Sequence, residues 1–244
     1  MSLQYKFYAT LLDSFQSYLS SSEIYQQFWG FSENPQLTEE EFEQKQYQDL
    51  IDKINRVPFE NEATAKGSAF NEVIDCLING TTSLDWDLSS NKERGVLIAQ
   101  NEKYNFEFNT NLCRSIRDRL TEGVTQELVE GTLSTKYGDV LLYGYLDYLL
   151  PFKVVDLKTT KKYNAFKYKN NWQHIVYPYC LNQKGIAINE FEYMATDLRK
   201  VYTESYVFNA EKDVPRLIDH CEAFIEFLEA NKDKITDKKI FAQQ

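Results

Sequence analysis

The feature that most limits the fold of this chain is a run of three strand-like segments in its middle third. Residues 125–134, 139–148 and 153–159 are rich in Val, Leu and Tyr, and turn signals separate them. Pro151 suits the second position of a turn over residues 150–153, which would join the last two segments as a hairpin. The pattern therefore predicts a strand meander at the centre of the fold.

Helical patterns lie on both sides of this meander. A capping box at Thr38–Glu41 predicts the start of a helix that runs to about Arg56, and Gly80 is the stop signal of a helix over about 64–79. The periodicity predicts further helices over residues 9–30, 109–120, 171–182 and about 215–231. A further strand pair is expected over 186–196 and 201–208. The segment Val96–Ala99 is either a strand or a short buried stretch. The order predicts one α/β domain over residues 1–244, with N-terminal helices to residue 60, a core over about 64–210 and a closing helix over about 214–231.

Several classes of protein are excluded by what the chain lacks. The sequence has no phosphate loop, no GxGxxG, no GxSxG and no HExxH motif, and its two histidines cannot form a histidine-rich site. The cysteines are Cys76, Cys113, Cys180 and Cys221. They form no CxxC pair, so we expect reduced, buried thiols and no iron–sulfur cluster. No apolar run approaches the roughly 18 residues of a membrane span, and we expect a cytoplasmic protein without a membrane partner.

The charge is distributed unevenly along the chain. The net charge is −10, which by itself disfavours nucleic acid as a partner. The segment from Lys153 to Lys169, however, holds six lysines and a single acid, Asp156, and so carries +5. Such a segment is either a solvated lysine loop or a binding surface for phosphates, and composition alone favours the loop.

The predicted hairpin concentrates chemistry at one point. Its register would place Asp147 opposite Asp156, with Cβ atoms about 4.5–5.5 Å apart. Lys158 follows Asp156 by two residues, so both side chains project from one face of the strand. Carboxylates this close repel each other unless a cation lies between them, and a divalent metal is the usual one. The same spacing is also typical of an exposed salt-bridge ladder, and spacing alone leaves both interpretations open.

Two more elements belong to the pattern. Gln173 and Tyr177 are four residues apart on a predicted helix and share one of its faces. Glu72 follows Gly67 on an earlier helix and would be able to supply another carboxylate. Taken singly, the first pair is typical of packing and Glu72 of a solvated helix surface.

Taken in order, these residues resemble the motifs of the PD-(D/E)XK nuclease superfamily, in its RecB-like exonuclease branch. The matching elements are Gly67 to Glu72, Gly144 to Asp147, Asp156-Leu-Lys158, and Gln173 to Tyr177. They span residues 65–185 approximately. One residue departs from the pattern, because Asn71 occupies the position that often holds a metal-binding histidine. An amide oxygen is a poorer ligand for manganese than imidazole, though it is acceptable to magnesium.

The resemblance implies a restriction-endonuclease-like fold, with a mixed central sheet flanked by helices. It also implies a stand-alone, metal-dependent DNA nuclease, in particular an exonuclease, of the kind found in phage, recombination and repair. Asp147, Asp156, the Leu157 carbonyl and Glu72 would bind Mg²⁺ or Mn²⁺.

In the same scheme, Lys158 would orient the attacking water, and Gln173 and Tyr177 would position the backbone or the hairpin. The DNA strand would be held by Lys161, Lys162, Lys167 and Lys169. The alternative is a DNA- or partner-binding module that keeps the fold and has lost turnover.

Overall fold

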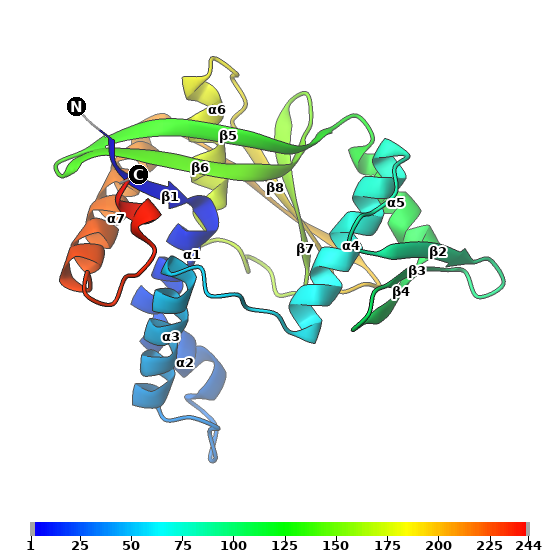
Figure 1. Cartoon of the computed structure of the whole chain (residues 1–244), viewed down its shortest axis with the longest axis horizontal. Coiled ribbons are helices and arrows are strands. Elements are labelled where there is room, and N and C mark those ends of the chain that lie inside the picture. Colours follow the sequence, from blue (N-terminus) through cyan, green and yellow to red (C-terminus); the bar gives the residue numbers. More distant parts are fainter. Residues whose placement is uncertain (1–2, 243–244) are drawn as a thin grey trace.

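The computed structural model describes residues 3–242, and its centre is a mixed six-stranded sheet (Figure 1). The path through the sheet is β1 (Leu3–Tyr8), β6 (Gly138–Leu149), β7 (Lys153–Thr159), β8 (Glu190–Thr196) and β9 (Val201–Val207), and β5 (Val124–Thr135) also pairs with β6. The β1–β6 and β7–β8 pairs are parallel, and the other pairs are antiparallel. The expected α/β architecture, a mixed sheet flanked by helices, is confirmed.

Two hydrophobic cores stabilise this sheet. The larger core packs the sheet against α1 (Ala9–Leu19), α3 (Glu39–Ile54), α6 (Gln173–Gln183), α7 (Ala210–Ala230) and the 3-10 helix η1 (Lys238–Phe241). The smaller core packs β7 against α4 (Glu62–Asn79), α5 (Thr110–Leu120) and a separate three-stranded sheet of β2 (Asp87–Asn91), β3 (Val96–Gln100) and β4 (Asn105–Asn109). Figure 1 shows these two halves side by side, joined by the sheet above and by the chain between α3 and α4 below.

Most of the helix boundaries follow from local signals. The Thr38–Glu41 capping box forms at the start of α3, and Gly80 ends α4 with φ of +64°. The single helix expected over residues 9–30 is wrong, because Ser20 interrupts it and a second helix, α2 (Ser21–Trp29), follows. The ambiguous stretch around Val96–Ala99 is a strand, β3, and β1 was not predicted at all.

The sheet has a gap on one edge of β6. β5 pairs with β6 along its whole length, so β1 and β7 must share the opposite edge. β1 pairs as far as Tyr143 and β7 pairs only with Tyr148 and Leu149. Residues 144–147 therefore have no strand partner on this edge, and we call this stretch the sheet gap. Within residues 3–242 no helix is long and apolar enough to cross a membrane.

Candidate functional site

The predicted hairpin register is confirmed next to the turn, but the predicted cross-strand pair of Asp147 and Asp156 does not form. Tyr148 pairs with Val155 and Leu149 with Val154, and the Leu150 N–H donates to the Lys153 carbonyl across the turn at 2.9 Å. One step further, at Asp147 and Asp156, the two strands separate. The Asp147 carboxylate then takes the place of a strand partner, because its Oδ2 accepts a hydrogen bond from the Leu157 N–H at 2.8 Å.

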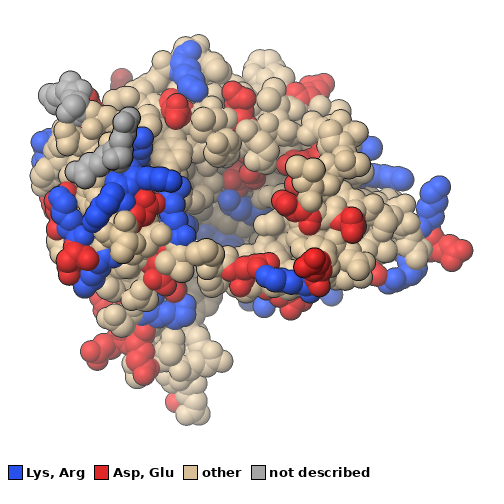
Figure 2. All heavy atoms as spheres, in the orientation of Figure 1, with Lys and Arg blue, Asp and Glu red and all other residues tan. Residues whose placement is uncertain are grey.

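A cavity of about 360 Å³ opens at the sheet gap. It is lined by Tyr8, Ala9, Thr10, Arg56, Tyr143, Gly144, Tyr145, Asp147, Asp156, Lys158, Gln173 and Tyr177. The structure therefore brings five of the predicted site residues together, from β6, β7 and α6. Figure 2 shows that the molecule is hollowed between its two halves and that side chains of both charges lie in the hollow.

Asp156 is the most deeply buried charge of the cavity, with 3% of its surface exposed. Its Oδ1 accepts a hydrogen bond from Gln173 Nε2 at 2.9 Å, and its Oδ2 lies 2.7 Å from Lys158 Nζ. Burial alone would lower the pKa of Lys158, but the two aspartates outweigh it and raise that pKa. Lys158 thus stays charged. An exposed salt-bridge ladder, which the spacing had left open, does not describe this arrangement.

The second carboxylate of the pair holds its proton more tightly than usual. Burial, followed by repulsion from Asp156, raises the pKa of Asp147 to about 7. A proton or another cation is therefore favoured between the two carboxylates near neutral pH.

The Gln173 and Tyr177 pair rests on a glycine of β6. Gln173 Nε2 donates to Asp156 and lies 3.4 Å from the Tyr177 hydroxyl. A Cβ at Gly144 would come within 2.6 Å of Tyr177 Cε1, so the ring fits against β6 because residue 144 has no side chain. The predicted common face of Gln173 and Tyr177 is confirmed, since both side chains line the cavity.

Helix α4 approaches β7 from the other half of the molecule. A Cβ at Gly67 would meet Thr159 Oγ1 at 3.0 Å, so this glycine allows the close approach. Asn71 Nδ2 lies 3.5 Å from the Leu157 carbonyl oxygen, and its Oδ1 is buried without a hydrogen-bond partner. Glu72 is half-buried, does not line the cavity, and contacts Cys76 Sγ at 3.9 Å. Its role as a metal ligand stays a prediction.

The predicted DNA-binding lysines lie in the exposed segment that follows β7. Lys161 lines a neighbouring hollow of about 340 Å³ together with Lys66 and Thr160. Lys167 has a structural contact as well, because its Nζ donates to Thr160 Oγ1 and its backbone N–H to Glu204. Lys162 and Lys169 are exposed. Binding of DNA by these side chains remains a prediction.

Two carboxylates near the site were not predicted. Asp13 of α1 accepts a hydrogen bond from the Trp172 N–H, directly before Gln173. Burial raises the pKa of Asp13 to about 6, although that hydrogen bond and the charges of Lys158 and Lys53 oppose the shift. Asp75 accepts a hydrogen bond from the Tyr148 hydroxyl at 2.6 Å, and its charge adds to the raised pKa of Asp147.

Of these two carboxylates, only Asp75 could have been linked to the site from the sequence. It follows Asn71 by four residues on α4, which is the spacing that places two side chains on one helix face. Asp13 lies in a helix that reads as ordinary core packing, and nothing local connects it with α6.

The donor set fits a hard divalent cation. Asn71 Oδ1 and Gln173 Oε1 are buried oxygens that accept no hydrogen bond within residues 3–242. Asp156 Oδ2 is paired with Lys158 Nζ, and of the two amides Gln173 lines the cavity while Asn71 does not. Carboxylate, amide and backbone carbonyl oxygens are the ligands that Mg²⁺ and Mn²⁺ take in proteins. The described residues contain no group of three or more His, Cys, Asp or Glu side chains that would hold a metal. Two aspartates supplemented by neutral oxygens are thus the available set.

Comparison with known proteins adds little to this geometry. No protein-family model matches the chain, and no curated protein matches it by sequence. Among solved structures, it is similar to one titled "Crystal structure of SSO0001", with 10% sequence identity and a TM-score of 0.46 over 93% of this chain and 78% of the other. At that level of similarity no function is transferred, and the site must be interpreted from its own residues.

Proposed function

We propose that this protein is a metal-dependent DNA nuclease, and specifically an exonuclease. The observation that carries the proposal is the cavity at the sheet gap. There, the buried Asp156 and the half-buried Asp147, whose pKa is raised, lie beside a charged lysine and the Gln173 Oε1 oxygen, which accepts no hydrogen bond within residues 3–242. Buried carboxylates held this way are costly unless a cation joins them.

In this proposal Asp147, Asp156 and the Leu157 carbonyl hold Mg²⁺ or Mn²⁺, which would activate a water and stabilise the leaving 3′ oxygen. Lys158, 2.7 Å from Asp156, orients the attacking water and offsets the charge that develops on the phosphate. Gln173 fixes Asp156 through Oδ1 and leaves Oδ2 toward Lys158. Tyr177, which packs against Gly144 of β6, supports Gln173. The DNA strand is attracted by Lys161, Lys162, Lys167 and Lys169.

The second candidate is a module that binds DNA or a protein partner without hydrolysis. It is favoured by Asn71 in place of a stronger ligand and by the absence of a three-residue metal group within residues 3–242. A net charge of −10 also favours a protein partner over DNA.

A digestion assay separates the two candidates. End-labelled linear single- and double-stranded DNA and a closed circle are incubated with the protein in Mg²⁺, in Mn²⁺ and in EDTA. An exonuclease releases nucleotides from the linear substrates with metal and leaves the circle intact. Asp156→Asn is the matched variant, because it keeps the shape of the side chain and removes its charge. DNA binding without any metal-dependent release in Mg²⁺ or Mn²⁺ would favour the second candidate.

A further inference from the structure

The wall of the cavity that faces away from α4 has a chemistry of its own. Tyr8, Thr10, Tyr143 and Tyr145 line it, and Arg56 adds a guanidinium that contacts the Tyr143 hydroxyl. Among residues 3–242, the carboxylates that line the cavity are Asp147 and Asp156 on the hairpin, and Asp237, which pairs with Arg56, does not line it. The cavity therefore has a side suited to cations and a side suited to anions.

Arg56 is held in an unusual conformation at this wall. It follows the end of α3 with φ of +54°, a value that costs a non-glycine residue on the order of 1 kcal/mol. Two long-range contacts orient its side chain. Nε forms an ion pair with Asp237 at 2.7 Å, and Nη2 donates to the Tyr143 hydroxyl at 3.0 Å. Strain of this kind persists when the surrounding structure requires the side chain at that place.

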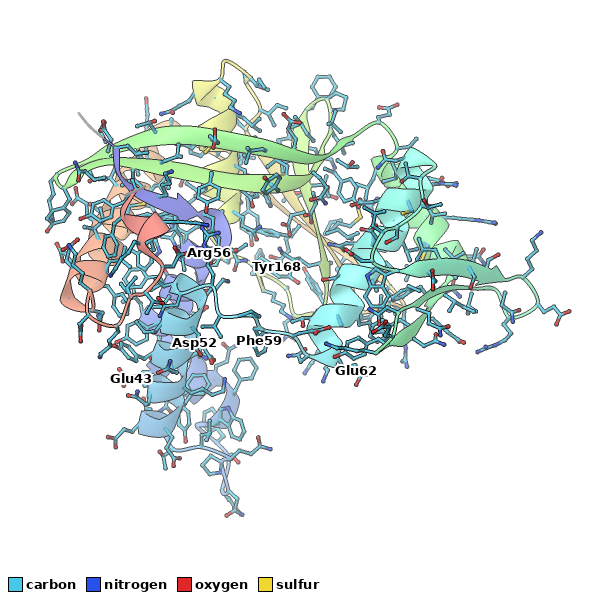
Figure 3. All side chains as sticks on the ribbon, viewed as in Figure 1. Glu43, Asp52, Arg56, Phe59, Glu62 and Tyr168 are labelled. Atoms are coloured by element: carbon cyan, nitrogen blue, oxygen red, sulfur yellow. The ribbon has the colours of Figure 1, made fainter. Side chains whose placement is uncertain are left out.

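The Arg56 guanidinium has N–H donors that these two contacts do not use. Its N–H groups outnumber the contacts to Asp237 and Tyr143, and 49% of the side chain remains exposed. Figure 3 shows Arg56 at the α3 end of the segment that leads to Glu62, on the side of the hollow away from α4. With Asp237 on Nε and Tyr143 on Nη2, the Nη1 group and the second Nη2 N–H remain for a planar, two-point contact with an oxyanion.

The start of α1 lies on the same wall. Ala9 and Thr10 line the cavity and open the helix, whose first turn has neither a side-chain cap nor an acidic residue. The first N–H groups of a helix have no partner within it and attract anions. Across the cavity, Gln173 is 3% exposed and its Oε1 has no partner, so the cavity is polar on both sides and incompletely satisfied.

We infer that Arg56 and the start of α1 form a phosphate-binding subsite beside the two aspartates. This inference rests on the proposed function and extends it, because it assigns a second phosphate of the same strand to this wall while the scissile phosphate lies at Asp147 and Asp156. The bound group is either the terminal phosphate of a strand end or an internal phosphodiester. Both present the same anionic oxygens.

Equilibrium binding in EDTA tests the inference without hydrolysis. The probes are an internally labelled single strand with a 5′-phosphate, with a 3′-phosphate or with neither, and a closed single-stranded circle. The main variant is Arg56→Asn, since asparagine tolerates a positive φ and the fold should be kept. The matched control is Arg94→Asn, which removes an exposed arginine paired with Glu107 in the turn between β2 and β3.

We expect Arg56→Asn to weaken binding about 10- to 100-fold and Arg94→Asn less than about twofold. A loss confined to one phosphorylated end identifies the terminal phosphate as the ligand. An equal loss on all four probes, with a smaller salt dependence, identifies an internal phosphate. Arg56→Lys keeps the positive charge and removes the planar two-point donor, and it should weaken binding by about three- to tenfold. It provides a second test if Arg56→Asn lowers the melting temperature of the protein.

The inference is overturned if both Arg56 variants bind every probe as tightly as the Arg94 variant while the wild type cleaves DNA. The nuclease proposal then stands without this subsite. If the wild type binds no probe and releases no nucleotide in Mg²⁺ or Mn²⁺, the proposed function itself fails, and the inference fails with it.

Discussion

The contact between Gly144 and Tyr177 allows a quantitative test of how the site is built. In Gly144→Ala the new methyl would lie 2.6 Å from Cε1 and 2.9 Å from the hydroxyl oxygen of Tyr177, well inside ordinary van der Waals contact. The ring must move by about 1 Å, and such overpacking costs about 1–3 kcal/mol. The backbone of residue 144 itself accepts alanine, because its φ is not positive. The whole penalty should therefore come from Tyr177.

A double-mutant cycle with Tyr177→Ala isolates this penalty. Urea unfolding should show a loss of about 1–3 kcal/mol for Gly144→Ala in the wild type. In the Tyr177→Ala background the same change should be neutral or stabilise by about 0.4–1 kcal/mol, since alanine restricts the unfolded chain. If the site acts as a nuclease, displacement of Tyr177 and Gln173 by about 1 Å should slow turnover about 100-fold. An equal loss of stability in both backgrounds would refute the reasoning.

Two other predictions concern the charges of the cavity. Asp147→Asn should stabilise the metal-free protein, with no gain below about pH 4 and a gain that grows toward pH 7. The reason is that Asp147 loses its proton near its ordinary pKa in the unfolded chain but only at a pKa of about 7 in the folded wild type. Urea titrations of both proteins between pH 4 and pH 8 check this, and parallel pH profiles would contradict it. Lys158→Ala should lower single-turnover rates by about 100-fold or more with little change in DNA affinity. The double variant Lys161→Ala/Lys162→Ala should instead weaken DNA binding, by an amount that shrinks as the salt concentration rises. Near-normal rates for Lys158→Ala in Mg²⁺ and Mn²⁺ would exclude the proposed role.

The hairpin at the centre of the site was predictable because its determinants are local. Pro151 favours the turn, and the turn fixes the register that pairs Tyr148 with Val155, one step before Asp147 and Asp156. The i, i+4 spacing of Gln173 and Tyr177 was equally readable. In each case the residues that decide the geometry are close together in the sequence.

The rest of the site depends on contacts between distant parts of the chain. β1 was missed because its parallel pairing joins residues 3–8 to residues 139–143, and no turn announces such a pair. The sheet gap follows from where β1 stops. Arg56 is oriented at the cavity by Asp237 and Tyr143, both far from it in the sequence. Periodicity and spacing contain no information on these three features.

The polar groups at the sheet gap are not explained by the stability of the fold. Residues 144–147 of β6 form no ladder on one edge, although a longer β1 or β7 would supply it. Asp147 substitutes for one of the missing hydrogen bonds, and the single positive charge of Lys158 interacts with both Asp156 and Asp147. Oxygens of Asn71 and Gln173 stay buried without partners, at a cost of about 1–3 kcal/mol each. Apolar residues at these positions would make a more stable protein, so stability does not explain them. The cation that we propose would supply further positive charge and a partner for the Gln173 oxygen at the cavity. That is the strongest physical argument for a cation at this cavity.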